Sequence, residues 1–166
     1  MKRIVEFHMF VDASFSKIQG VGVGGMLVVE DLDGDSPLIE TRVFKVKNNI
    51  RAELASTIWA LETFKERQAA HCGALKLYLD CASIINLVQR RQKLEANAFM
   101  SARKKAVLPN ADLYKRFYEL YDETDTEIIR VKGHSPSVSH TPWQKKFACV
   151  DRFARAELRR LVSKKG

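Results

Sequence analysis

The fold is decided by the segment VEFHMFVD at residues 5–12, an apolar run that ends on a carboxylate. Side chains alternate between the two faces of a β-strand, so the odd-numbered residues from Val5 to Val11 share one face. His8, Phe10 and Asp12 share the other face. The pattern predicts a central strand with Asp12 at its exit. Because Asp also favours turns, this carboxylate alone does not indicate a functional site.

The length and composition of the chain favour one globular domain over residues 1–166. A chain of 166 residues with 46% hydrophobic residues can bury a core without disulfide or metal staples. No apolar run reaches the roughly 18 to 20 residues that span a membrane, and no secretory signal is evident. Cys72, Cys81 and Cys149 are odd in number and lack the Cys-x-x-Cys spacing, so neither a disulfide framework nor a zinc site is indicated. We therefore expect a cytoplasmic protein without a membrane partner.

Positive charge is concentrated in two parts of the chain, whose net charge is +8. Residues 90–116 contain eight Lys or Arg against two acids, and residues 145–165 contain eight against two. Solvated helix faces can have this composition, but two such surfaces favour a polyanionic partner, most naturally nucleic acid.

Periodicity and turn residues divide the rest of the chain into further elements. Strands are expected at 20–30, 39–46, 75–80 and 127–131, and helices at 51–70, at 83–94, from 112 onward, and at 143–163. The order βββαβααβα is an α/β pattern: three strands in an antiparallel meander, then a fourth reached by a helical crossover, in a five-stranded mixed sheet with helices on both faces. Gly20, Gly22 and Gly24 leave one face of the second strand bare, which predicts a close approach there, including one to the groove of a bound duplex.

The predicted topology gathers carboxylates at one edge of the sheet. If the strands ending at Asp12 and Asp80 are parallel neighbours, both side chains reach the same edge, and the crossover helix places Glu53 between them. Asp151 of the last helix can approach from the side, although it could instead form an ordinary helix ion pair with Arg155. Crowded carboxylates require a compensating cation, and oxygen ligands suit Mg²⁺ or Mn²⁺. Two such ions roughly 4 Å apart would support in-line phosphodiester hydrolysis.

Five short segments, in order along the chain, resemble motifs of the type 1 ribonuclease H family. They are VDAS at 11–14, NIRAEL at 49–54 with ALE at 60–62, LD at 79–80, VKGH at 131–134 and VDRFAR at 150–155. Each segment is weakly specific, but together they span nearly the whole chain. The resemblance implies a ribonuclease H-like fold.

The resemblance also implies a reaction and the residues that carry it out. Asp12, Glu53, Asp80 and Asp151 would bind two Mg²⁺ ions, and His134 would assist proton transfer or product release. The RNA strand of an RNA–DNA hybrid would be cut, leaving 3′-hydroxyl and 5′-phosphate ends. No protein partner is implied. The residues expected to bind nucleic acid are Ser14, Asn49, Arg90, Arg91, Lys93, Arg103, Lys104 and Lys105.

Several residues depart from the family pattern near these motifs. Ala13 follows the first Asp where Gly is usual, and Cys81 and Ala82 replace two polar residues. Phe147 stands where the family has Asn, four residues before the last Asp. These changes predict looser recognition of the hybrid. They also leave two alternatives: a DNA nuclease or resolvase of the same fold, and a non-catalytic module that binds nucleic acid.

Overall fold

The computed structural model describes residues 5–34, 38–68, 73–132 and 141–164. Its strands are β1 (Val5–Ser16), β2 (Val21–Val29), β3 (Glu40–Lys45), β4 (Gly73–Leu79) and β5 (Thr126–Arg130). Its helices are α1 (Asn49–Arg67), α2 (Ala82–Ile85), α3 (Leu87–Ala96), α4 (Ala111–Glu123) and α5 (Pro142–Ser163). The predicted elements are all present, but the helix expected at 83–94 is two helices that meet at Asn86. None of the helices in the described residues is long and apolar enough to cross a membrane.

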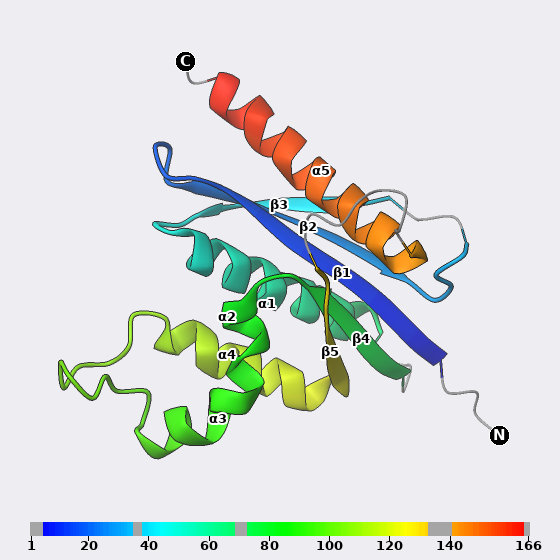
Figure 1. Cartoon of the computed structure of the whole chain (residues 1–166). Coiled ribbons are helices and arrows are strands. Elements are labelled where there is room, and N and C mark those ends of the chain that lie inside the picture. Colours follow the sequence, from blue (N-terminus) through cyan, green and yellow to red (C-terminus); the bar gives the residue numbers. More distant parts are fainter. Residues whose placement is uncertain (1–4, 35–37, 69–72, 133–140, 165–166) are drawn as a thin grey trace.

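The five strands form one mixed sheet in the order β3-β2-β1-β4-β5, with helices on both faces (Figure 1). β1, β2 and β3 form the predicted antiparallel meander, and β4 is parallel to β1. The parallel ladder runs from the pair Val5 and Gly73 to the pair Phe10 and Tyr78. The prediction that the first strand ends at Asp12 was wrong, because β1 continues to Ser16 beside β2. Asp12 instead lies just beyond the ladder that β1 shares with β4.

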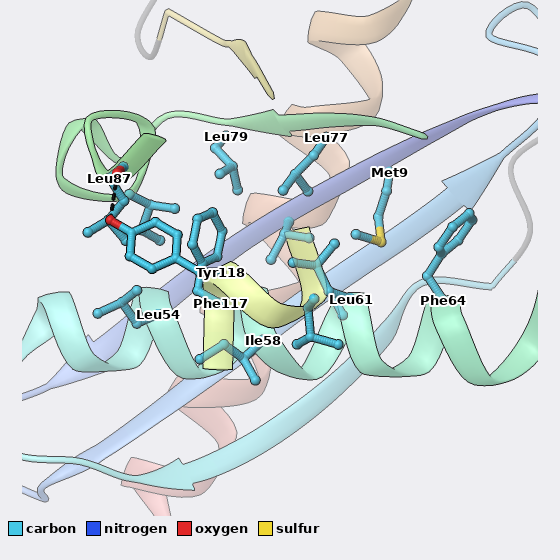
Figure 2. Close-up of a cluster of buried hydrophobic side chains, with 14 of the residues drawn as sticks. Met9, Leu54, Ile58, Leu61, Phe64, Leu77, Leu79, Leu87, Phe117 and Tyr118 are labelled. Atoms are coloured by element: carbon cyan, nitrogen blue, oxygen red, sulfur yellow. Dashed lines mark hydrogen bonds between the residues drawn. The ribbon is translucent and has the colours of Figure 1, made fainter. Parts of the chain in front are cut away.

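Both faces of β1 are buried, because a separate layer of helices covers each face of the sheet. On one face, Met9 lies in a cluster with residues of α1, β4 and α4, including Leu61, Leu77 and Phe117 (Figure 2). On the opposite face, Phe10 belongs to a second cluster that contains Val150 of α5. The alternation in VEFHMFVD therefore assigns alternate residues to two cores, as a fully covered central strand requires.

Residues of α1 occupy the space beside Gly22 and Gly24 of β2. The expectation that a nucleic-acid groove approaches the strand at these two glycines was therefore wrong. A Cβ atom at Gly22 would lie 2.8 Å from Cβ of Ala52, and one at Gly24 would lie 2.7 Å from Cβ of Ser56. Both contacts come from the first turns of α1. The bare face of β2 therefore lets the helix that carries Glu53 pack directly against the sheet.

Candidate active site

Three of the four predicted carboxylates meet at the end of the β1–β4 ladder. Asp12 comes from β1, Glu53 from α1, and Asp80 is the first residue after β4. Each offers an oxygen, and these oxygens all lie within 4.8 Å of one another. The parallel pairing of β1 with β4 is what brings Asp12 and Asp80 to the same edge.

The start of α1 is fixed by its capping residue, which determines where Glu53 lies. The Asn48 side chain accepts a hydrogen bond from the backbone N–H of Arg51 at 2.8 Å, and α1 begins at Asn49. This start places Ala52 against Gly22 and turns Glu53 inward. Only 7% of the Glu53 surface is exposed, so the residue belongs to the buried site and is not a solvated first-turn acid.

Burial and mutual repulsion raise the pKa values of two of these carboxyls. Burial, followed by a side-chain hydrogen bond with Asp151 and the charges of its neighbours, raises the pKa of Asp12 to about 10. Burial, followed by the charges of Asp80 and Asp151, raises the pKa of Glu53 to about 8. The protein by itself therefore holds protons here at neutral pH. Such a cluster of oxygen ligands fits a hard divalent cation, which would relieve the same repulsion.

Asp151 links the cluster to α5 and is also an ion-pair partner. It hydrogen-bonds to Asp12, and its Oδ1 atom lies 3.0 Å from Nε of Arg155 one turn later. Asp151 therefore forms the ion pair considered from the sequence and also contacts Asp12 of the cluster. The residue approaches the site from the side, as predicted, while Arg155 holds its carboxylate from the solvent side.

The residues expected to bind nucleic acid lie in different settings. Ser14 lies on β1 two residues beyond Asp12, and Asn49 is exposed at the start of α1. Arg90 and Lys93 are exposed on α3. The guanidinium of Arg91 is instead held by α4 and its own helix: it lies 2.5 and 2.8 Å from the Asp122 oxygens, 2.9 Å from Glu95, and over the ring of Tyr118.

Arg103, Lys104 and Lys105 are exposed on what we call the basic loop, residues 97–110 between α3 and α4. The pair Met100 and Val107 forms an antiparallel bridge that closes the loop beneath these three side chains. His134, predicted to assist proton transfer or product release, lies outside the described residues.

The surroundings of two residues that depart from the family pattern, Phe147 and Cys81, can be described from the structure. Phe147 is 6% exposed and packs in the core beneath α5, so an apolar residue fits this position. Cys81 directly follows Asp80, and burial raises the pKa of its thiol, so the thiol is neutral at physiological pH.

The contacts of Arg51 were not predicted. Its guanidinium reaches residues 58 to 61 positions further along the chain, at the end of the basic loop and the start of α4. Spacing within the sequence carries no signal for a pair so far apart.

Comparisons with known proteins agree with this architecture. The family model for RNase H matches residues 5–159. The ribonuclease H of Desulforamulus reducens is 32% identical over 132 residues, which cover 78% of this chain and 77% of that protein. The ribonuclease H of Chlorobium phaeobacteroides is 31% identical over 134 residues, covering 76% of this chain and 82% of that protein.

Solved structures share the fold at low sequence identity. LC11-RNase H1 in complex with an RNA/DNA hybrid has a TM-score of 0.61 at 13% identity, covering 88% of this chain and 91% of that one. The N-terminal RNase H domain of a Mycobacterium tuberculosis protein has a TM-score of 0.63 at 15% identity, covering 98% and 99% of the two chains. Together, the fold, the family match and the relatives above 30% identity show that this chain belongs to the ribonuclease H family of enzymes.

Proposed function

We propose that this enzyme hydrolyses the RNA strand of RNA–DNA hybrids at the carboxylate cluster, leaving 3′-hydroxyl and 5′-phosphate ends. The observation that carries the proposal is the convergence of Asp12, Glu53 and Asp80 within 4.8 Å in a chain of this family. The substrate is supported by the relatives named ribonuclease H and by LC11-RNase H1, a protein of the same fold that was solved with an RNA/DNA hybrid.

The carboxylates are proposed to hold two Mg²⁺ ions, with Mn²⁺ as the alternative. Asp12, Glu53 and Asp80 provide oxygen ligands from three elements, and Asp151 provides a fourth from α5. When bound, such ions activate a water molecule and stabilise the departing oxygen of the phosphodiester. The chain itself buries Asp12 and Glu53 beside Asp80, and Arg155 pairs with Asp151 next to them.

The substrate is proposed to lie across the carboxylate cluster and the basic loop. Ser14 on β1 and Asn49 at the start of α1 are proposed to contact the cleaved strand. Arg90 and Lys93 on α3, with Arg103, Lys104 and Lys105 on the basic loop, provide charge for the phosphate backbone. We propose that Arg91 supports this surface through Asp122 and does not bind phosphate. His134 is proposed to assist proton transfer or product release.

The test is to incubate labelled RNA–DNA hybrid, duplex RNA and duplex DNA with the protein, with and without Mg²⁺. We expect cleavage of the RNA strand of the hybrid only, and only with Mg²⁺. Glu53→Gln should abolish it, whereas Glu62→Gln is a matched control on the same helix, because Glu62 pairs with Arg116 at 3.1 Å outside the cluster. Cleavage of duplex DNA with intact hybrid would favour a DNA nuclease, and binding without any cleavage would favour a non-catalytic module.

A further inference from the structure

We propose that Arg51 is a positioning residue that fixes the basic loop relative to the carboxylate cluster, and thereby determines which phosphodiester is cut. The inference rests on the proposed function, because it assumes that the loop holds substrate phosphates while the cluster cuts the strand. Arg51 would touch neither the scissile phosphate nor a metal ion, and its effect would pass through the loop.

The guanidinium of Arg51 makes four hydrogen bonds to the end of the basic loop and the start of α4. Its Nη1 atom donates to the carbonyl oxygen of Pro109 at 3.3 Å, to Oδ1 of Asn110 at 3.2 Å and to Oδ1 of Asp112 at 3.3 Å. Its Nη2 atom donates to Oδ2 of Asp112 at 2.9 Å. The two Nη atoms of one guanidinium thus donate to a backbone carbonyl, to a side-chain amide oxygen and to both oxygens of a carboxylate.

The other end of Arg51 belongs to the helix that builds the active site. Its backbone N–H donates to the capping side chain of Asn48, and Glu53 follows two residues later. Asn49, a proposed substrate contact, precedes it in the same turn. The Arg51 side chain therefore connects the first turn of α1, which carries Glu53, to the base of the basic loop.

Hydrogen bonds within the basic loop connect its two sides, so that a constraint at its base also restrains its tip. Ser101 donates its N–H to the carbonyl of Ala106 at 2.7 Å, and Leu108 donates to Phe99 at 2.8 Å. Phe99 is 9% exposed and lies under the ammonium group of Lys115. Because these bonds tie the two sides of the loop together, fixing residues 109 and 110 constrains where the basic side chains of residues 103–105 lie.

The geometry of the contact favours an arginine over a lysine. A planar guanidinium can bind a carboxylate with two parallel bonds and still donate elsewhere, whereas a lysine ammonium acts as a single point charge. A displacement of about 1 Å away from the reacting geometry can slow a reaction by about a hundredfold. Removing this contact should therefore change which phosphodiester is cut more than it changes the rate of hydrolysis at a correctly positioned phosphodiester.

The experiment compares Arg51→Gln with Arg116→Gln on a long hybrid of defined sequence. Arg116 also joins α1 to α4, through Glu62 at 3.1 Å, so it is a matched control for weaker packing between these helices. We expect Arg51→Gln to spread cleavage over more positions and to raise KM by about tenfold, with the salt slope of binding unchanged and kcat at the best-seated bond retained. Arg116→Gln should keep the parent's cleavage positions, and Arg51→Lys should recover part of the selectivity.

A second measurement tests the contact without relying on activity. Arg51→Gln should speed amide hydrogen exchange in residues 98–108 by about tenfold or more, while the core of the sheet keeps its protection. Asp112→Asn should give the same pattern, and combining the two changes should add little, because both remove the same interaction. Unchanged exchange and unchanged cleavage positions in Arg51→Gln, or equal effects from Arg116→Gln, would overturn the proposal. A parent protein that left hybrid whole would instead refute the proposed function, and the exchange data would still decide whether Arg51 holds the loop.

Discussion

Magnesium binding at the carboxylate cluster should release protons, because the metal-free site retains them. Asp12 and Glu53 have pKa values of about 10 and about 8, raised first by burial and then by their acidic neighbours. A carboxylate must be ionised to bind a cation, so each of these protons has to leave. Adding Mg²⁺ to the metal-free protein should therefore displace these protons into the buffer, to an extent that depends on the pH.

The size of the effect follows from the two pKa values. At pH 7 Asp12 is almost fully protonated and Glu53 is about nine-tenths protonated, so binding should release about two protons. At pH 9 Glu53 is already about nine-tenths ionised, and the release should fall to about one proton. The apparent affinity for Mg²⁺ should rise by about a hundredfold per pH unit around pH 7, and by about tenfold per unit around pH 9.

Titration calorimetry in buffers of different ionisation enthalpy counts these protons directly. Glu53→Gln should lower the count at pH 7 to about one. Glu62→Gln, on the exposed part of the same helix, should leave the count at about two. A release well below one proton at pH 7, or a Mg²⁺ affinity that does not change between pH 6 and pH 8, would refute this account of the site.

Four other changes test neighbouring parts of the structure. The metal-free protein should lose thermal stability as the pH rises from 4.5, the pKa of Glu53 in the unfolded chain, through about 8, its pKa in the folded protein. The reason is that the folded state binds more protons than the unfolded state in this pH range. Mg²⁺ should reverse the loss. Asp80→Asn should abolish hybrid cleavage while leaving hybrid binding in a gel-shift assay nearly unchanged; cleavage at the parent's rate would remove Asp80 from the site. Replacing Arg103, Lys104 and Lys105 by Ala should weaken hybrid binding and reduce its salt slope by about 0.7 to 0.9 for each phosphate that is no longer neutralised; an identical slope would show that these side chains point away from the substrate. Gly24→Ala should lower the free energy of unfolding in urea by about 1–3 kcal/mol, because the new methyl group meets Ser56. Gly34→Ala should be nearly neutral, because a Cβ atom there would lie no closer than 3.4 Å to its neighbours.

The parts of the site that lie at the ends of strands could be predicted from the sequence. The apolar run of β4 ends at Leu79 and Asp80 follows directly, as predicted, whereas β1 continues past Asp12 to Ser16, and only its ladder with β4 ends before Asp12. A crossover helix between two parallel strands has only one face toward the sheet, which places Glu53. These inferences need only the periodicity of each element and the geometry of parallel pairing.

Contacts between side chains that are distant in the chain could not be predicted in this way. The bond of Arg51 to Asp112 and that of Arg91 to Asp122 depend on how α1, α3 and α4 pack, and any exposed arginine is equally consistent with phosphate binding. The charge of residues 90–105 therefore predicts one substrate surface, although Arg91 is engaged within the protein. Periodicity specifies which face a residue occupies, but not which partner it meets there.

The glycines of β2 show why the site needs both layers of helices close to the sheet. Gly24 and Gly25 are adjacent and so face opposite sides, where Ser56 of α1 and Val150 of α5 fill the space of the missing side chains. Gly25 is also the partner of Asp12 across the β1–β2 ladder. A larger residue at either position would push one helix outward, and with it either Glu53 or Asp151. The pair of glycines thus lets both helices approach Asp12, so that carboxylates from the two layers of the fold reach one site.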